Sequence, residues 1–231
     1  MKTIGLIGGM SWESSAHYYQ LINQSVKARL GGQHNARSLL LTVDFAEIET
    51  LQVQGDWQAL ADKMACAARQ LAAGGADGIV LCTNTMHKLA PVIEAASPLP
   101  LLHIADATGK ALRQAGIDKV GLLGTRYTME QDFYRQRLTS GHGIDVLIPQ
   151  VHDREDVHRI IYEELCQGIL REDSRQLYGQ IMARLQQQGA QAIVLGCTEI
   201  GLLIKQADSA LPVFDTTVLH AEAAVEWALA T

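Results

Sequence analysis

The sequence of 231 residues predicts an α/β fold with two similar, Rossmann-like parallel-sheet lobes, related by pseudo-twofold symmetry, with a cleft between them. First, short runs of Ile, Val and Leu alternate with stretches of helical periodicity, as expected for parallel strands buried on both faces. Second, segments of the first half recur in the second half. Third, apolar residues make up 48% of the chain, enough to form the cores of two domains of about 100–120 residues.

The predicted strands are short and lack strict alternation of polar and apolar residues. They are Thr3–Ile7, Ser38–Val43, Gly78–Leu81, Leu101–Ile104, Lys119–Leu123, Asp145–Ile148, Ala192–Leu195 and Pro212–Phe214. Helices with an apolar period of about 3.6 residues are predicted between the strands. They include Trp57–Gly75, Asp153–Leu170 and Ser174–Ala190.

The internal repeat covers three pairs of segments. "TIGLIGG" (Thr3–Gly9) matches "KVGLLGT" (Lys119–Thr125), "GADGIVLCTNTMH" (Gly75–His87) matches "GAQAIVLGCTEIG" (Gly189–Gly201), and "SPLPLLHIADAT" (Ser97–Thr108) matches "SALPVFDTTVLH" (Ser209–His220). We therefore expect a first lobe of residues 1–117 completed by a C-terminal helix, residues 216–231, and a second lobe of residues 118–215.

Charge and cysteine content exclude several classes of protein. The net charge of −6 and the pI near 5.7 argue against a nucleic acid or an anionic membrane surface as partner. No apolar run approaches the roughly 20 residues of a membrane span, and the start is too short and glycine-rich for a secretory signal. Four scattered cysteines without a CxxC or CxxH pair indicate neither a disulfide framework nor a zinc site. We expect a cytoplasmic protein with free thiols and no metal.

Thr83 and Cys197 occupy matching positions of the repeat, each just after a predicted strand. Ligands bind beyond the carboxyl ends of parallel strands, so we expect the two residues on opposite walls of one cleft. A thiol there, beside a helix start, is expected to have a pKa lowered from about 8.5 toward neutral. Cys82 should point away from the cleft because strand side chains alternate. The other cysteines, Cys66 and Cys166, lie in helical patterns and are expected to be small buried hydrophobes.

Other polar positions allow two interpretations each. The "LIGGMSWESS" turn (Leu6–Ser15) favours carboxylate binding, or is a plain tight turn with Ser11 as helix cap. His87 is either an acid–base group or a hydrogen-bonded structural histidine. Thr125 and Thr128 either bind substrate oxygens or cap a helix. Asp153 and Glu155 look like helix N-terminal charges.

These motifs together resemble the aspartate/glutamate racemase family over essentially the whole chain. The resemblance is carried by "GLIGGMSWESS" (Gly5–Ser15), the "CNTxH"-type motif near His87 and the "GCTE" motif (Gly196–Glu199). "VDFAEIE" (Val43–Glu49) and "IIYEEL" (Ile160–Leu165) resemble the aspartate racemase branch. The resemblance implies a cofactor-independent enzyme in which two cysteines face each other across the substrate Cα. One thiolate takes the α-proton and the opposite thiol returns one from the other face.

The chain departs from this pattern at one position, because the family's "CNT" reads "TNT" (Thr83–Thr85). The resemblance implies that Cys197 is the base for the L-enantiomer and that Thr83 is the opposed donor. It also implies a set of substrate-binding residues: Met10, Ser11, Gln52, Asn84, Thr85, Thr125, Thr198 and Glu199.

The sequence thus predicts an isomerase, an amino-acid racemase that acts on aspartate, glutamate or a related small amino acid with preference for the L-form. The resemblance also implies a possible homodimer. A single-cysteine decarboxylase of malonate-type acids is an alternative, as is a non-catalytic two-lobed amino-acid-binding protein. Neither key motif contains an Arg or Lys, so the residue that holds the distal group of the substrate stays open.

Overall fold

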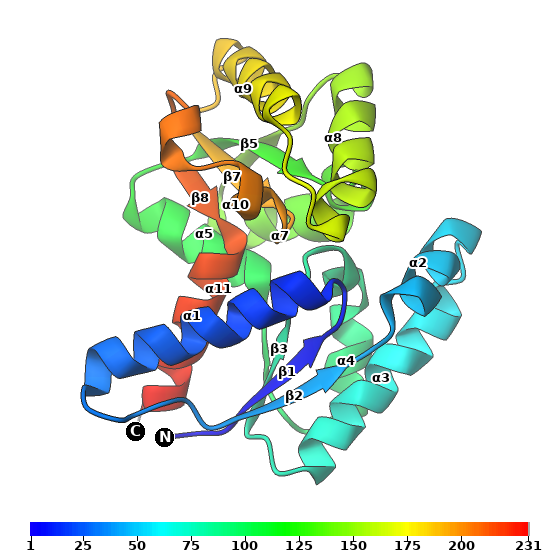
Figure 1. The fold of residues 1–231 in the computed structure, drawn as a ribbon, viewed down its shortest axis with the longest axis vertical. Coiled ribbons are helices and arrows are strands. Elements are labelled where there is room, and N and C mark those ends of the chain that lie inside the picture. Colours follow the sequence, from blue (N-terminus) through cyan, green and yellow to red (C-terminus); the bar gives the residue numbers. More distant parts are fainter. Residues whose placement is uncertain (231) are drawn as a thin grey trace. The chain divides into compact units, whose positions relative to one another are not determined.

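The computed structural model describes residues 1–230 as an α/β protein with two compact units (Figure 1). Unit 1 comprises residues 1–103 and the segment from His220 onward, and unit 2 comprises Ile104–Leu219. Each unit contains one four-stranded parallel sheet with helices packed on it. The predicted fold class is therefore confirmed.

The sheet of unit 1 has the strand order β2-β1-β3-β4. Its strands are β1 (Ile4–Gly8), β2 (Ser38–Thr42), β3 (Gly78–Leu81) and β4 (Leu101–Leu102). The helices are α1 (Trp12–Leu30), α2 (Phe45–Gln54), α3 (Trp57–Ala73), the 3-10 helix η1 (Thr85–Leu89) and α4 (Ala90–Ala96). The two central strands, β1 and β3, are buried along their whole length, as expected for strands covered on both faces.

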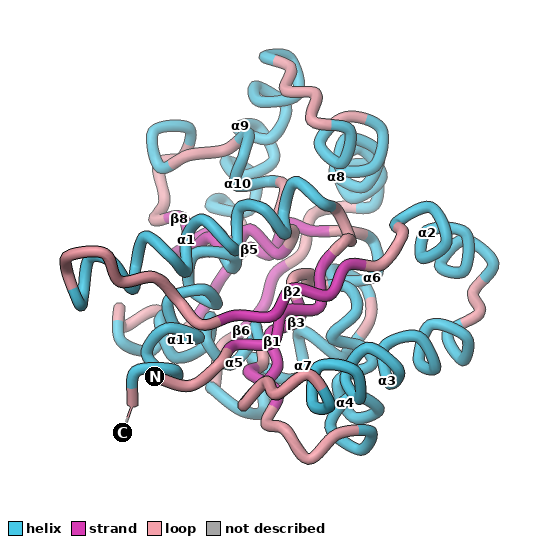
Figure 2. Tube along the Cα trace, turned by 60° about the horizontal axis from the view of Figure 1, so that its bottom comes forward, coloured by secondary structure: helices cyan, strands magenta, loops and turns pink. Residues whose placement is uncertain are grey.

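The sheet of unit 2 repeats this order as β6-β5-β7-β8. Its strands are β5 (Lys119–Gly124), β6 (Asp145–Leu147), β7 (Ala192–Gly196) and β8 (Val213–Asp215). Its helices are α5 (Ile104–Gln114), α6 (Arg126–Glu130), α7 (Asp132–His142), α8 (Val151–Glu163), η2 (Leu165–Gln167), α9 (Glu172–Gln187), α10 (Ile200–Leu203) and η3 (Gln206–Asp208). The identical strand order confirms the repeat, and Figure 2 traces the strands of both sheets.

The two units exchange the helix that follows their fourth strand. Helix α5 follows β4 of unit 1, but Ile104 and Leu112 pack in an apolar cluster with residues of β5, α7 and β7. Helix α11 (Thr216–Leu229) follows β8 of unit 2, but Ala221 and Val225 pack with residues of β1, α1 and β3. The unit boundaries therefore fall at 103/104 and 219/220, whereas the sequence suggested 117/118 and 215/216. The sequence also assigned the C-terminal helix to the first lobe, so at that end the boundaries differ only in the first turn of α11. At α5 the difference arises because a helix belongs to the sheet that it buries, and chain order alone does not reveal which sheet that is.

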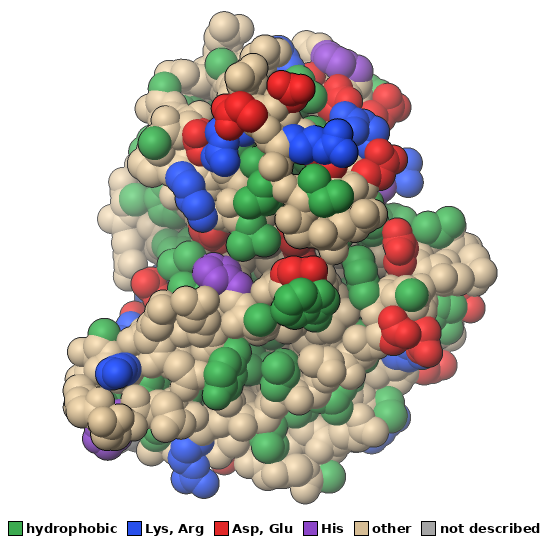
Figure 3. Space-filling model, viewed as in Figure 1, with side chains coloured by type: hydrophobic (Ala, Val, Ile, Leu, Met, Phe, Trp, Pro, Cys, Tyr) green, Lys and Arg blue, Asp and Glu red, His purple; other side chains and the backbone are tan. Residues whose placement is uncertain are grey.

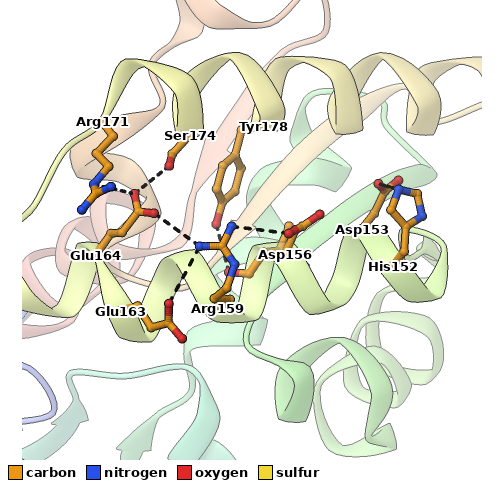
Figure 4. Close-up of polar contacts among 10 residues, drawn as sticks. His152, Asp153, Asp156, Arg159, Glu163, Glu164, Arg171, Ser174 and Tyr178 are labelled. Atoms are coloured by element: carbon orange, nitrogen blue, oxygen red, sulfur yellow. Dashed lines mark hydrogen bonds and ion pairs between the residues drawn. The ribbon is translucent and has the colours of Figure 1, made fainter.

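Helices α8 and α9 carry closely mixed acidic and basic side chains (Figure 3). One ion pair is buried at its acidic end: Asp153 is 1% exposed and accepts bonds of 2.8 and 2.7 Å from Arg184. Asp153 also lies 2.9 Å from His152 (Figure 4). Asp153 is thus a buried ion-pair partner, and the helix N-terminal position predicted for it is observed in the first turn of α8.

We expect Arg184→Met to lower the free energy of unfolding by about 3 kcal/mol, because the carboxylate of Asp153 would stay buried without its main counter-charge. Urea denaturation followed by circular dichroism measures this loss. The matched control is Arg135→Met, whose partner Asp132 is 82% exposed. That variant should lose less than about 1 kcal/mol. Equal losses in the two variants would contradict the assignment.

Candidate active site

In unit 2, two glycines allow the central strands to end side by side. Gly124 of β5 pairs with Gly196 of β7, and a Cβ on Gly124 would lie only 2.7 Å from the carbonyl oxygen of Gly196. Any other residue at position 124 would push the strands apart. Thr125 and Cys197 follow these glycines directly, so both emerge at the carboxyl edge of the sheet, where ligands of parallel sheets bind.

Cys197 is hydrogen-bonded to a carboxylate two residues further along the chain. Its Sγ donates to Oε2 of Glu199 at 3.0 Å, and the hydroxyl of Thr198 donates to the same oxygen at 2.8 Å. All three side chains are buried, with 7, 3 and 2% of the surface of Cys197, Thr198 and Glu199 exposed. The resting state is therefore a neutral thiol whose proton already points at an acceptor.

The expectation of a lowered thiol pKa is wrong. Burial raises the pKa of Cys197 well above its ordinary value, and the charge of Glu199 and the thiol of Cys166 act in the same direction. The helix that follows, α10, spans only Ile200–Leu203. Desolvation and the adjacent carboxylate therefore outweigh any stabilisation of the thiolate by main-chain dipoles.

Thr125 is a helix cap in this structure. Its hydroxyl accepts a bond of 3.3 Å from the backbone N–H of Thr128 and lies 3.2 Å from the hydroxyl of Thr128. Of the two roles that the sequence allowed for Thr125, helix capping is the one observed. The side chain is buried, with 5% of its surface exposed. Both threonines are thus held in place beside the residue pair Gly124 and Gly196.

Behind Cys197, α8 and α9 are tied together by polar contacts (Figure 4). The hydroxyl of Tyr178 donates to the carbonyl of Val157 at 3.4 Å, and Ser174 donates to the 6%-exposed Glu164 at 2.6 Å. Burial raises the pKa of Tyr178, and nearby Cys197 and Glu164 raise it further. Tyr178 and Cys197 belong to one apolar cluster. The hydrogen bonds between α8 and α9 therefore stabilise the helices that pack in the same core as the thiol.

In unit 1, the glycine turn after β1 is fixed by its own serines. Gly9 has φ +90°, and a Cβ there would lie 2.2 Å from the carbonyl oxygen of Val43. Ser15 accepts a bond from the N–H of Gly9 and donates to the carbonyl of Ser11, both at 2.8 Å. Ser11 caps α1 by accepting a bond from the N–H of Ser14 at 3.3 Å. The capping role predicted for Ser11 is therefore observed.

Thr83, Asn84 and Thr85 follow β3 and are buried, with 7, 2 and 5% of their surface exposed. The predicted residue Gln52 comes to them from α2, because its Nε2 lies 3.4 Å from Sδ of Met86. Met10 packs in the same apolar cluster as Met86. Since β1 and β3 pair as neighbours, the turn that contains Met10 and Ser11 and the segment Thr83–Thr85 follow the carboxyl ends of adjacent strands.

The remaining cysteines differ from one another. Cys82 is fully buried in the apolar cluster that contains α1 and α11, and burial raises its pKa. It is thus a core residue of unit 1. Cys66 is exposed, which contradicts its predicted burial, because α3 turns its neighbours Ala65 and Ala67 to the core instead. Cys166 is partly buried at the edge of the cluster of Cys197.

Sequence reasoning singled out His87 but missed two buried imidazoles that pack beside it in unit 1. The rings of His87 and His103 lie 4.5 Å apart, and those of His87 and His220 lie 5.8 Å apart. Their residues are 2, 6 and 0% exposed. The spacing of these histidines in sequence gives no signal, because β4 and α11 bring them to His87 only in the folded chain.

Hydrogen-bond partners fix the tautomers of two of these rings. Nδ1 of His87 lies 2.7 Å from the carbonyl oxygen of Thr83, so it must carry the proton. Nε2 of His220 lies 2.6 Å from the carbonyl oxygen of Leu102, so its Nδ1 accepts from the hydroxyl of Tyr18 at 2.9 Å. Burial lowers the pKa of His220 to about 4, which keeps the ring neutral.

Among the described residues, no group of His, Cys, Asp and Glu side chains has the arrangement of a metal site. In the same part of the chain, no helix is both long and apolar enough to cross a membrane. The fold and the site together define a class of protein. It consists of α/β proteins with two similar parallel-sheet units, each of which carries a polar motif just after the equivalent central strand.

The family is shown by comparison with known proteins. The family model described as Asp/Glu/Hydantoin racemase matches residues 7–224, and the chain belongs to this family. It is similar to a solved structure of a candidate Asp/Glu racemase from Yersinia pestis, with 60% identity, a TM-score of 0.92 and full coverage of both chains. It is also similar to an aspartate racemase homologue from Pyrococcus horikoshii OT3, with 31% identity, a TM-score of 0.85 and 99% coverage of both chains.

A curated relative is the broad specificity amino-acid racemase RacX of Bacillus subtilis, 28% identical over 156 residues, which are 68% of this chain and 66% of that protein. The aspartate racemase of Picrophilus torridus shares the fold, with 20% identity, a TM-score of 0.79, and coverage of 99% of this chain and 94% of that one.

We expect the free energy of unfolding to fall by up to about 3 kcal/mol between pH 6.5 and pH 4 on account of His220. Its pKa is about 4 in the folded chain against an ordinary value of 6.5, so the unfolded chain binds the extra proton in this window. The groups that face the ring are Tyr18 and His87. Urea titrations at each pH measure the effect, and His220→Gln should flatten the profile over this window. Parallel profiles for the two proteins would refute the assignment to His220.

Proposed function

We propose that the protein is a cofactor-independent amino-acid racemase that inverts Cα of aspartate, glutamate or a related small amino acid, with preference for the L-form. The observation that carries this proposal is the bond of 3.0 Å between the thiol of Cys197 and Glu199 in a chain of the Asp/Glu/Hydantoin racemase family. A thiol bonded to a carboxylate can pass its proton directly to that carboxylate, which is the step that would make a thiolate base.

In the proposed reaction, Cys197 is the base for the L-enantiomer. The raised pKa of the thiol means that a thiolate must be made when substrate binds. Glu199 would take the thiol proton, which leaves a thiolate and a neutral carboxyl group. The ammonium group of the amino acid would further favour the thiolate. The thiolate would then take the α-proton, and the electron pair of the broken C–H bond would stay on Cα as a carbanion.

Thr83 would deliver a proton to the opposite face of the carbanion. The proton that Glu199 took from the thiol would return to Thr83 through water, which restores the hydroxyl of Thr83 and the carboxylate of Glu199, while Cys197 keeps the α-proton as a neutral thiol. A hydroxyl is a much weaker acid than a thiol, so this step should be the slower one. The substrate carboxylate would be held by hydroxyl and amide donors that stabilise the carbanion. The proposed donors and lining residues are Met10, Ser11, Gln52, Asn84, Thr85, Thr125 and Thr198.

The substrate class rests on the relatives. RacX is described as a broad specificity amino-acid racemase, and the glutamate racemase of Francisella tularensis, 15% identical and similar in fold, was solved with D-glutamate. We propose that this chain also takes free amino acids. A panel of L- and D-amino acids in deuterium oxide, followed by NMR at Cα, would find those that exchange the α-proton.

A decarboxylase of malonate-type acids is the second candidate, because unit 2 has a thiol where unit 1 has Thr83 at the matching position of the repeat. A single thiol can protonate a carbanion from one face only. Release of CO2 from a malonate-type acid, with no exchange in the amino-acid panel, would favour this reaction over racemisation.

Cys197→Ala should abolish exchange of the α-proton, because it removes the proposed base. Proton NMR of the substrate in deuterium oxide measures the exchange, and circular dichroism checks that the variant is folded. The matched control is Cys82→Ala, which removes a buried thiol in unit 1 that is bonded to no proposed site residue. It should keep the parent rate within about threefold. Full activity of Cys197→Ala would refute the mechanism.

We expect the L-substrate to gain deuterium at Cα faster than the D-product accumulates. Free enantiomers have an equilibrium constant of one, so catalytic efficiency must be equal in both directions. A preference for the L-form therefore reflects either limits of binding or assay on one side, or return of the proton by Cys197 to the face from which it came, and we propose the second. Thr83→Cys should raise the rate from the D-side by restoring a thiol, as measured by chiral chromatography. Equal exchange and inversion in the parent, with no gain in Thr83→Cys, would show that threonine is already a competent partner.

A further inference from the structure

The repeat allows the surroundings of Thr83 and Cys197 to be compared position by position. The strands β3 and β7 take the same place in the two sheets, and Val80 pairs with Leu102 as Val194 pairs with Phe214. The next residues, His103 and Asp215, are therefore equivalent. The motif after β3 and β7 in turn aligns His87 with Gly201.

These equivalent pairs fill the same volume with different chemistry. In unit 1 the rings of His87 and His103 pack 4.5 Å apart. In unit 2 a Cβ on Gly201 would lie only 2.1 Å from Oδ2 of Asp215, so a carboxylate takes the space in which unit 1 has an imidazole. That carboxylate also accepts a bond of 2.8 Å from the N–H of Thr217 and caps α11.

A second equivalent pair involves the exchanged helices. In unit 1 the hydroxyl of Tyr18 on α1 donates to His220 of α11 at 2.9 Å. In unit 2 the hydroxyl of Tyr134 on α7 lies 3.4 Å from that of Thr108 on α5. The tyrosine is common to both units, whereas the imidazole of unit 1 is replaced by a threonine in unit 2.

The duplicated scaffold thus folds with or without imidazoles at these three positions. Unit 2, which carries Cys197, has Gly201, Asp215 and Thr108 there. Unit 1, which carries Thr83, has three histidines, and one of them bonds directly to Thr83: Nδ1 of His87 lies 2.7 Å from its carbonyl oxygen. The N–H of Thr83 is bonded as well, to the carbonyl of Leu81 at 2.8 Å. Both main-chain groups of Thr83 are therefore fixed.

We infer that His87 is a positioning residue for the step that Thr83 performs. The N–H of its imidazole holds the carbonyl of Thr83 and so fixes where the hydroxyl points, while His103 and His220 pack around the ring and hold it in place. Delivery of a proton to the carbanion requires the hydroxyl to be aligned with Cα. This inference rests on the proposed racemase function. It adds the residue that orients Thr83 for the slower step, the delivery of a proton to the carbanion.

The test compares two substitutions in the full chain, His87→Leu and His87→Asn. The leucine fills space but cannot donate, whereas the amide nitrogen of asparagine takes the place of Nδ1. Two rates are measured on the amino acid found by the exchange panel: α-deuterium exchange of the L-form by NMR, and inversion by chiral chromatography. His87→Leu should lower inversion about fivefold or more while exchange stays within about threefold. His87→Asn should recover most of the inversion rate.

The control is His34→Ala, an exposed histidine of unit 1, which should leave both rates at parent values. Equal losses of exchange and inversion in His87→Leu and in His87→Asn would mean that His87 only supports the fold, and would overturn the inference. Unchanged inversion in His87→Leu would overturn it too. Absence of exchange in the parent for every amino acid would instead refute the proposed function itself, and the inference would fall with it.

Discussion

The close parallel pairing of two central strands in each sheet is the constraint on which the rest of the structure depends. In unit 2 the pairing continues to the last residue of both strands, Gly124 and Gly196, where no Cβ could be accommodated. In unit 1 the turn after β1 passes close to Val43, the residue that follows the neighbouring strand β2. A side chain at Gly9 would collide with the backbone of Val43. The polar motifs emerge from these strand ends, so their positions are set by backbone contacts and not by flexible loops.

A buried carboxylate beside a buried thiol sets the electrostatic character of unit 2. The pair would be unfavourable if both groups were ionised, because two negative charges in a poorly solvated place repel each other. One proton shared between Cys197 and Glu199 avoids this, and the hydroxyl of Thr198 satisfies the same oxygen. The structure therefore favours the neutral thiol, and under the proposed mechanism a bound cationic ammonium group would favour the thiolate.

Much of the architecture could be predicted from the sequence. The strands β1, β3, β5 and β7 follow from short runs of Ile, Val and Leu, since burial on both faces leaves no other pattern. The repeat gave the common topology and placed Thr83 and Cys197 after equivalent strands. The partner of α5 could not be predicted in the same way, because only the folded chain shows that it buries Leu112 with residues of β5 and α7.

The chemistry of the candidate site was harder to predict than its location. The pKa of the Cys197 thiol was expected to fall because a helix start follows this residue. Burial and the carboxylate of Glu199 raise it instead. Burial is a property of the whole fold, so the local sequence does not reveal it. Two of the three imidazoles were missed for a similar reason. His103 and His220 are far apart in sequence and meet His87 only through β4 and α11. Cys66, in contrast, lies in a helix rich in alanine. Alanine occurs on both faces of this helix, so the sequence does not indicate which face is buried.

The exchange of α5 and α11 bears on how such a chain could have arisen. A half-length ancestor with a single copy of the repeat would have carried its last helix with no sheet of its own to cover. Two copies of that ancestor would have completed each other by trading helices, as in a domain-swapped homodimer. Fusion of two tandem genes would then have turned an intermolecular swap into an intramolecular one, after which each half was free to change its strand-end residues independently. A threonine in one half and a cysteine in the other is a divergence that a symmetric dimer of identical chains could never express.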